Sequence, residues 1–201
     1  MLRRISAEMG RSIVLFLFVV CAAGPAIGDD DTSSLSADEK KVGQEKIEKM
    51  ANETLATLYE TQPKAKDVIA QSQGYAVFRN FGLNILFAGG GSGKGVAVNQ
   101  VTGDKTYMKM LEVQAGLGVG IKKFQLVWVF EDQADFKNFI SQGWEFGGQA
   151  TAAAKLDDDG GAMQGAISVK QGVWVYQLTA DGLAVELTLK GTKYYRDDKL
   201  N

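Results

Sequence analysis

Hydrophobic residues in the first third of the chain follow a helical spacing. Between residues 36 and 62 they recur at steps of three and four, which places them on one face of a helix. This face comprises Ile47, Met50, Ala51, Leu55, Leu58 and Tyr59. Ser36 and Glu39 have the spacing of a capping box. Gly43 weakens the first turns, so we expect the firm helix to begin near Gln44.

A proline and a glycine punctuate the next segment. Pro63 ends the first helix, and residues 64–74 are expected to form a second, short helix that Gly74 closes. From Tyr75 onward, hydrophobic residues mostly alternate with polar ones, which predicts strands. We expect these strands over residues 75–78, 83–88, 94–100, 106–111, 112–121 and 124–130.

The segment FQLVWVF, residues 124–130, is apolar on both faces, so we expect it to form a central, buried strand. Residues 131–143 return to a helical spacing and stop at Gly143, and residues 172–191 predict a further hairpin. Short strands joined by turns, with the helices segregated from them, are typical of an α+β fold. We therefore expect a strongly curved antiparallel β-sheet or a barrel-like sandwich, with N-terminal helices and one mid-chain helix.

The glycine-rich stretch FAGGGSGKGVAV, residues 87–98, is similar to a phosphate-binding loop but does not match one. That loop needs G-x-x-x-x-G-K-[ST] between a strand and a helix. Ala88 stands where the first glycine belongs, and Gly95 stands where the hydroxyl residue belongs. The residues that follow alternate as a strand does, so we expect no nucleotide. We interpret the stretch as a wide turn with a glycine bulge at the rim of the sheet.

Gly116, Gly118 and Gly120 lie on one face of the strand predicted over residues 112–121. A dinucleotide fingerprint needs G-x-G-x-x-G at the start of a helix, and here the third glycine comes one place early. Three glycines on one face remove every side chain there, so something must approach that face closely. We expect strong curvature of the sheet at this glycine-faced strand. A ligand that lies against the glycines is the alternative.

The first 28 residues have the pattern of a secretory signal peptide. Basic residues precede a short apolar run, and small residues stand before a cut after Gly28. A retained membrane anchor is the alternative, although the apolar run at 13–23 falls short of the roughly 20 residues that a bilayer needs. Lipidation at Cys21 is a third possibility, although Val20 is larger than the small residue expected before a lipidated cysteine. We expect an exported protein of the periplasm or cell envelope, with a flexible acidic leader and helix start over residues 29–43.

The amino-acid composition excludes the common types of catalytic site. The chain has no histidine, and its one cysteine lies inside the predicted signal peptide. Nucleophile–histidine systems and Cys/His zinc sites therefore cannot be built, and we expect no enzyme, no cofactor and no metal. Three of the 22 basic and one of the 24 acidic residues precede the predicted cut, which leaves a net charge of −4. Nucleic-acid binding normally needs a basic surplus, so we expect no such partner.

Several ordered motifs resemble one known family. LATLYETQPKAKDVIAQSQGYAVFRNF is similar to the start of the SYLF domain, also called the Ysc84-type or DUF500 domain. AGGGSGKGVAV, AGLGVGI, LVWVF and GGQATAAA follow in the family's order. The resemblance covers about residues 55–195 and places one domain over residues 44–201. Arg79 departs from the family, which usually has a proline there, and the last third departs from the family's usual wording.

The resemblance implies binding rather than catalysis. Eukaryotic members bind phosphoinositides or actin, and bacterial members are small envelope proteins. An exported member would meet an anionic phospholipid or another envelope lipid at the membrane surface. The candidate lipid-binding residues are Lys40, Lys41, Lys46, Lys49, Lys94, Lys122 and Lys123. Two alternatives stay open: a first helix that docks on its own core with a solvated, mixed-charge outer face, and a structural or protein-binding module without a lipid.

Overall fold

A computed structural model describes residues 34–85, 88–115, 120–145, 155–156, 165–180, 182–183 and 191–201. The predicted signal peptide and the start of the acidic leader lie outside these ranges. The helices are α1 (Ala37–Thr61), α2 (Ala65–Gln71) and α3 (Gln133–Gln142). The strands are β1 (Gly74–Ile85), β2 (Ala88–Asn99), β3 (Lys105–Ala115), β4 (Gly120–Phe130), β5 (Trp144–Glu145), β6 (Lys155–Leu156), β7 (Ile167–Lys170), β8 (Val173–Thr179), β9 (Gly182–Leu183) and β10 (Thr192–Arg196).

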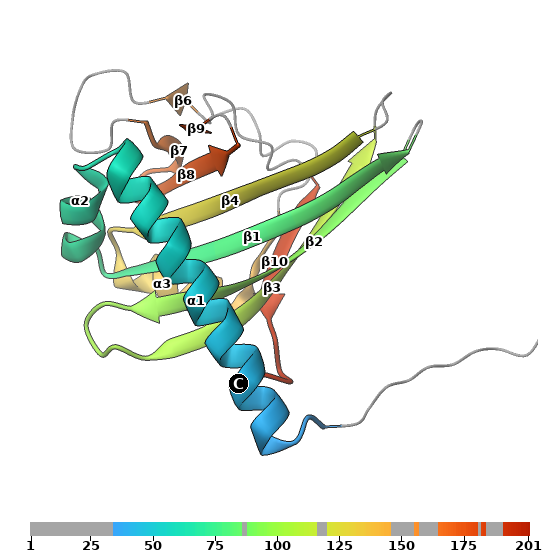
Figure 1. Ribbon diagram of the computed structural model, residues 1–201. Helices are drawn as coiled ribbons and strands as arrows, with labels where there is room; N and C mark the ends of the chain where they lie inside the picture. The colour runs from blue at the N-terminus through green and yellow to red at the C-terminus, as the bar shows by residue number, and fades with distance from the viewer. Residues whose placement is uncertain are drawn as a thin grey trace, which may run out of the picture. The chain divides into compact units, whose positions relative to one another are not determined.

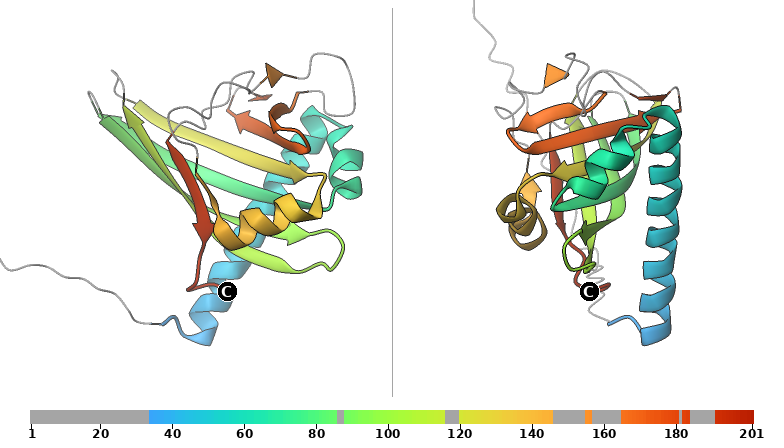
Figure 2. Two further views of the ribbon diagram at one scale, coloured as in Figure 1. Left: turned by 180° about the vertical axis from the view of Figure 1, so that it is seen from behind. Right: turned by 90° about the vertical axis from the view of Figure 1, so that its left-hand side faces the viewer.

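The described strands form one antiparallel sheet with the order β5-β10-β3-β2-β1-β4-β8-β7-β6, and β9 pairs with β8. Helices α1 and α2 cover one face of the sheet and α3 covers the other (Figures 1 and 2). We call these the α1 face and the α3 face. The expected α+β fold, with N-terminal helices and one mid-chain helix, is confirmed.

Ring contacts on the α3 face demonstrate how strongly the sheet curls. Trp128 of β4 and Tyr194 of β10 have ring centroids 5.1 Å apart, although β1, β2 and β3 lie between their strands. In a flat sheet that separation is about 19 Å, since neighbouring strands lie about 4.8 Å apart. The sheet therefore curls around the α3 face into a half-barrel, as the expected curvature requires.

An aromatic cluster fills the inside of this curl. Its large members, all less than 2% exposed, are Phe78, Trp128, Phe130, Phe136, Phe139 and Tyr194. Helix α3 supplies two of them, and its ends follow the predicted pattern. Asp132 caps its N-terminus by accepting hydrogen bonds from the N–H groups of Ala134 and Asp135. Gly143 ends it with φ of 73°, a left-handed value that favours glycine. The stop predicted at Gly143 is confirmed.

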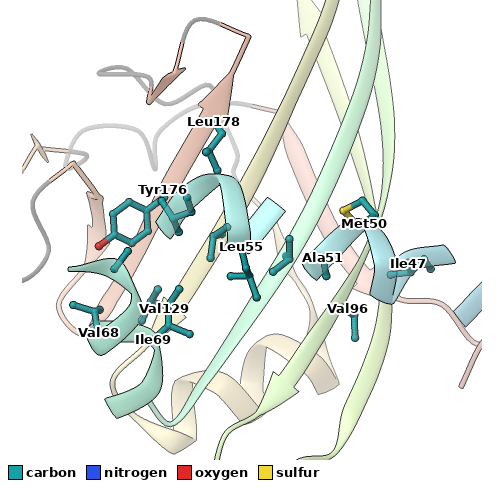
Figure 3. Close-up of a cluster of buried hydrophobic side chains, with 14 of the residues drawn as sticks. Ile47, Met50, Ala51, Leu55, Val68, Ile69, Val96, Val129, Tyr176 and Leu178 are labelled. Carbon is teal, nitrogen blue, oxygen red and sulfur yellow. The ribbon is translucent and has the colours of Figure 1, made fainter. Parts of the chain in front are cut away.

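The predicted apolar stripe of α1 packs on the other face of the sheet (Figure 3). Ile47, Met50 and Leu55 are buried there together with Val96 of β2 and Leu178 of β8. The alternative in which the first helix packs its apolar face on the core of the same domain is therefore correct for that face. The central position predicted for residues 124–130 is also confirmed, because β4 pairs with β1 and β8 and all residues from Leu126 to Phe130 are fully buried.

Two helix boundaries differ from the sequence-based expectation. Helix α1 begins at Ala37 with a complete Ser36–Glu39 capping box, so the expected start near Gln44 is wrong. A methyl group at Gly43 would lie 2.9 Å from a Leu200 methyl carbon, so this glycine makes room for the C-terminal segment. Helix α2 ends at Gln71, with Ser72 as its cap. Gly74 instead begins β1, and a Cβ atom at this position would lie 2.4 Å from the Phe136 ring.

The glycine-rich stretch is a strand, and the prediction of a wide turn with a bulge there is wrong. Strand β2 pairs without interruption with β1 on one side and β3 on the other. Three of its glycines point to the α3 face, where side chains of the neighbouring strands occupy the space above them. These are Gly91 beneath Asn80 and Glu112, Gly93 beneath Met110, and Gly95 beneath Phe78. Alternate glycines thus let the flanking strands close over β2.

The glycine-faced strand predicted over residues 112–121 is also corrected. Residues up to Ala115 belong to β3, whereas Gly120 begins β4 opposite Asn84 of β1. Strands β2 and β1 lie between β3 and β4 in the sheet, so the segment does not form one strand. Gly116 and Gly118 lie outside the described residues, and so does most of the expected second strand of the C-terminal hairpin.

Candidate functional site: a basic groove beside helix α1

Three cations lie directly opposite one another across the centre of the sheet. Strand register pairs Arg79 of β1 with Lys94 of β2, and Lys94 with Lys109 of β3. All three share the α1 face, because each stands two residues from a position buried beneath α1: Val77, Val96 and Tyr107, respectively. Like charges directly opposite on neighbouring strands destabilise a sheet. We call Arg79, Lys94 and Lys109 the cation row.

The cation row forms part of the floor of a groove of about 840 Å³. Lys46 of α1 and Lys123 of β4 also line it, so five cations converge on one space. Among the described residues that line the groove, none has a carboxylate. Apolar side chains complete the lining, chiefly those of Ile47, Met50, Phe81, Leu178 and Tyr195. The groove therefore offers positive charge next to apolar surface.

Carboxylates at the margin neutralise two of the five cations. Arg79 lies 3.4 Å from Glu53 of α1, in a pair that is about half exposed at both ends. Lys109 lies 2.9 Å from the buried carboxylate of Asp197. Lys46, Lys94 and Lys123 form no ion pair with another described residue, and the ammonium of Lys123 lies 5.7 Å from the centre of the Phe81 ring. Three cations are thus available to an anion.

A hydrogen-bonded pair fixes α1 above the groove. The Tyr107 hydroxyl donates to one oxygen of Glu48, at 2.5 Å, and the other oxygen lies 2.7 Å from the Lys105 ammonium. The bonds from Lys105 and Tyr107 lower the pKa of Glu48. Burial, followed by the hydrogen bond to Glu48 and then by the Glu48 charge, raises the pKa of Tyr107 far above its usual value. This helix is therefore held to β3 by a charged contact as well as by its apolar stripe.

The sheet brings together only some of the predicted lipid-binding lysines. Lys46, Lys94 and Lys123 meet in the groove. Lys40, Lys41 and Lys49 lie on α1 and do not line it. Lys122 stands opposite Gly82 in β4, and its side chain lies outside what the structure describes. Gly116, Gly118 and Gly120 have no described part in the groove.

Sequence reasoning missed Arg79 and Lys109 as members of this site. Arg79 was conspicuous only as a departure from the family's proline, and Lys109 lies in an unremarkable strand. Their closeness to Lys94 depends on the register of three strands, which a hydrophobic pattern alone does not fix. A signal was nevertheless present, since each cation of the row stands two residues from a β-branched or aromatic core position, on the same face of its strand.

Other kinds of site find less support in the described part of the chain. No group of three or more acidic, histidine or cysteine side chains is placed to hold a metal ion there. Across the same residues, each helix is either too short or too polar to span a bilayer.

Comparison with known proteins identifies the family. Residues 111–201 match the family model described as Ysc84, Las17-binding protein actin regulator. The chain is 37% identical over 158 residues to Beta cell expansion factor A of Aeromonas veronii. The matched region covers 77% of this chain and 57% of that protein. The chain thus spans little more than half the length of this curated relative. With the ordered motifs and the curled sheet, these matches establish that the chain belongs to the Ysc84 (SYLF) family.

Proposed function

We propose that this protein is a non-enzymatic module of the cell envelope that binds anionic amphiphiles, with a phosphate-bearing lipid headgroup in the basic groove. The observation that carries the proposal is the cation row. Lys94 stands between Arg79 and Lys109 and forms no ion pair with a described residue, so like-charge repulsion at the centre of the row is not offset by a carboxylate there. A phosphate accepts charge-assisted hydrogen bonds from arginine and lysine together, and it would offset this repulsion.

The lining of the groove favours an amphiphile over a simple anion. Phe81, Ile47 and Met50 lie beside the cations, so an acyl or glycerol portion attached to the phosphate would find apolar contact there. The groove's volume falls within the usual range for small-molecule sites, about 300–1,000 Å³. Membership of the Ysc84 family supports a binding domain rather than an enzyme, and the absence of histidine from the whole chain points the same way.

Export to the periplasm or cell envelope is part of this proposal. It rests on the signal-like pattern of the first 28 residues. An envelope location would place the groove near anionic phospholipids.

A protein partner is the second candidate, because the family model's description names a binding protein and an actin regulator. An acidic peptide would use the same five cations. Its binding would not require the apolar lining, and it would not depend on vesicles. The two candidates therefore make different predictions for membranes.

Co-flotation with vesicles tests the proposal. The purified chain is expected to float with vesicles of phosphatidylcholine and phosphatidylglycerol at low salt, and to stay behind with phosphatidylcholine alone. Lys94→Gln should weaken partitioning about fivefold, since each basic residue near an anionic surface contributes about 1 kcal/mol. Lys49→Gln, a matched change on α1 outside the groove, should leave partitioning within about twofold of the original chain.

Two results would overturn the proposal. One is a folded chain that fails to float with anionic vesicles at low salt. The other is equal loss from Lys94→Gln and Lys49→Gln, which would indicate diffuse attraction rather than a site in the groove.

A further inference from the structure

Large apolar side chains are exposed on the α1 face, beyond the cation row. Phe81 of β1 is 54% exposed, Leu111 of β3 is 45% exposed, and Val113 of β3 is 63% exposed. Phe81 and Leu111 flank Ser92 in one register row, two residues past the cation row, and Val113 lies two residues further along. We call Phe81, Leu111 and Val113 the apolar edge.

The α1 face is therefore graded along its strands. Nearest α1 lie the buried positions Val77, Val96 and Tyr107, then the cation row, then the apolar edge. Successive rows are about 7 Å apart, because a strand rises about 3.4 Å per residue. Figure 1 shows β1, β2 and β4 running on past α1 at this end of the sheet. The apolar edge is thus not covered by a helix.

Two lysines outside the cation row flank the apolar edge. Lys123 of β4, which also lines the groove, stands opposite Phe81. Lys193 of β10 stands opposite Leu111 and lies 3.7 Å from the exposed carboxylate of Glu145. Long lysine side chains can lay their methylene stems along apolar surface while the ammonium reaches towards charge. An apolar row with cations beside it and on the side nearer α1 follows the order of groups at a bilayer surface, where acyl chains lie beneath anionic phosphates.

We propose that this end of the sheet is a docking surface for an anionic bilayer. The apolar edge enters the layer between headgroups and acyl chains, and the cation row lies at the level of the phosphates. The inference rests on the proposed function and adds to it which side of the protein meets the membrane: the apolar edge faces the bilayer, and α1 with its acidic side chains faces away. The groove then opens where a headgroup can enter it.

Val101 provides a matched control at the opposite end of the same strands. It lies in the turn between β2 and β3 and is 69% exposed, more than any residue of the apolar edge. Its neighbours include Asp104, and the nearby Lys105 is already paired with Glu48. A substitution there has the same chemistry without the cations.

The test compares Val113→Asp with Val101→Asp in flotation with phosphatidylglycerol-containing vesicles. Val113→Asp is expected to lower the partitioning of the protein onto these vesicles about tenfold or more. This is the effect of losing one valine side chain that is buried in the bilayer. Val101→Asp should leave partitioning within about twofold. If both variants partition alike, the docking surface is refuted, while the groove stands or falls separately on Lys94→Gln against Lys49→Gln. If the original chain does not float at all, the proposed function fails as well.

A labelling measurement keeps the test decisive if Val113→Asp disturbs folding. In a Cys21→Ser background, Val113→Cys and Val101→Cys are each labelled with an environment-sensitive dye. Anionic vesicles should shift the emission of the dye at position 113 to the blue and leave that at position 101 unchanged. A blue shift at position 101, or none at either position with vesicle-bound protein, would overturn the orientation.

Discussion

Replacing Gly95 by alanine places a methyl group where β2 has no room for one. An ideal Cβ at this position would lie 2.3 Å from the carbonyl oxygen of Val77 and 2.4 Å from the Phe78 ring. The oxygen belongs to the backbone of β1, so relief requires the strand pairing itself to move. Overpacking of a core costs about 1–3 kcal/mol, and a disturbed ladder hydrogen bond adds about 1 kcal/mol.

The intrinsic gain from replacing a strand glycine offsets only about 0.5–1 kcal/mol of this cost. We therefore expect Gly95→Ala to lower the free energy of unfolding by about 2 kcal/mol, which corresponds to about 4–8 °C in Tm for a domain of this size. Urea unfolding followed by tryptophan fluorescence measures the loss, with circular dichroism as a second probe.

Gly90→Ala is the matched control in the same strand. Gly90 is exposed, and the nearest atom to its Cβ would be the Glu112 carbonyl oxygen at 3.4 Å, an ordinary contact. This variant should lie within about 0.5 kcal/mol of the original chain or be slightly more stable. Equal destabilisation by both substitutions would refute the reasoning, because it would mean that the glycines of β2 do not act through close approach on the α3 face.

Two further predictions concern polar contacts on the two faces of the sheet. Glu48→Gln should cost about 1 kcal/mol of stability near neutral pH. Folding lowers the pKa of Glu48 from 4.5. The stability difference between the original chain and the variant should therefore persist above about pH 4.5 and vanish as the pH falls through the lowered pKa. Urea unfolding at pH 7 and pH 3 checks it, and a difference that is unchanged at pH 3 would contradict the sign. Asn80→Ala removes the amide that donates to the buried carboxylate of Glu112 at 2.5 Å and should cost about 1.5–3 kcal/mol in thermal or urea unfolding. Asn52→Ala, at an exposed position of α1, serves as the control, and equal effects would argue against a specific Asn80–Glu112 contact.

Features specified by neighbouring residues could be predicted from the sequence. The capping box needs only Ser36 and Glu39, and the α3 stop needs only Gly143 after an amphipathic run. The central position of β4 followed from a strand that is apolar on both faces. Each of these is a local preference that tertiary structure reinforced.

Features specified by strand register could not be predicted in this way. The cation row joins residues that are 15 positions apart at each step, and nothing in the local pattern of any one strand indicates its partners. The same limitation applies to the glycines: the sequence predicts close approach at Gly116, Gly118 and Gly120, of which Gly116 and Gly118 lie outside the described residues, and it does not predict the close approach at β2. That approach depends on Asn80, Met110 and Glu112, which lie over β2 from both sides.

The glycines and the cation row are two consequences of one alternation in β2. Its inward positions 91, 93 and 95 are glycines, and position 94 between them places a lysine on the α1 face. The neighbouring strands close over the glycines, and the sheet curls towards the α3 face. The α1 face, which carries Arg79, Lys94 and Lys109, is therefore the outer face of the curl. Under the proposed function, a stretch similar to a phosphate loop would serve an anion through a lysine side chain on a curved sheet rather than through main-chain amides.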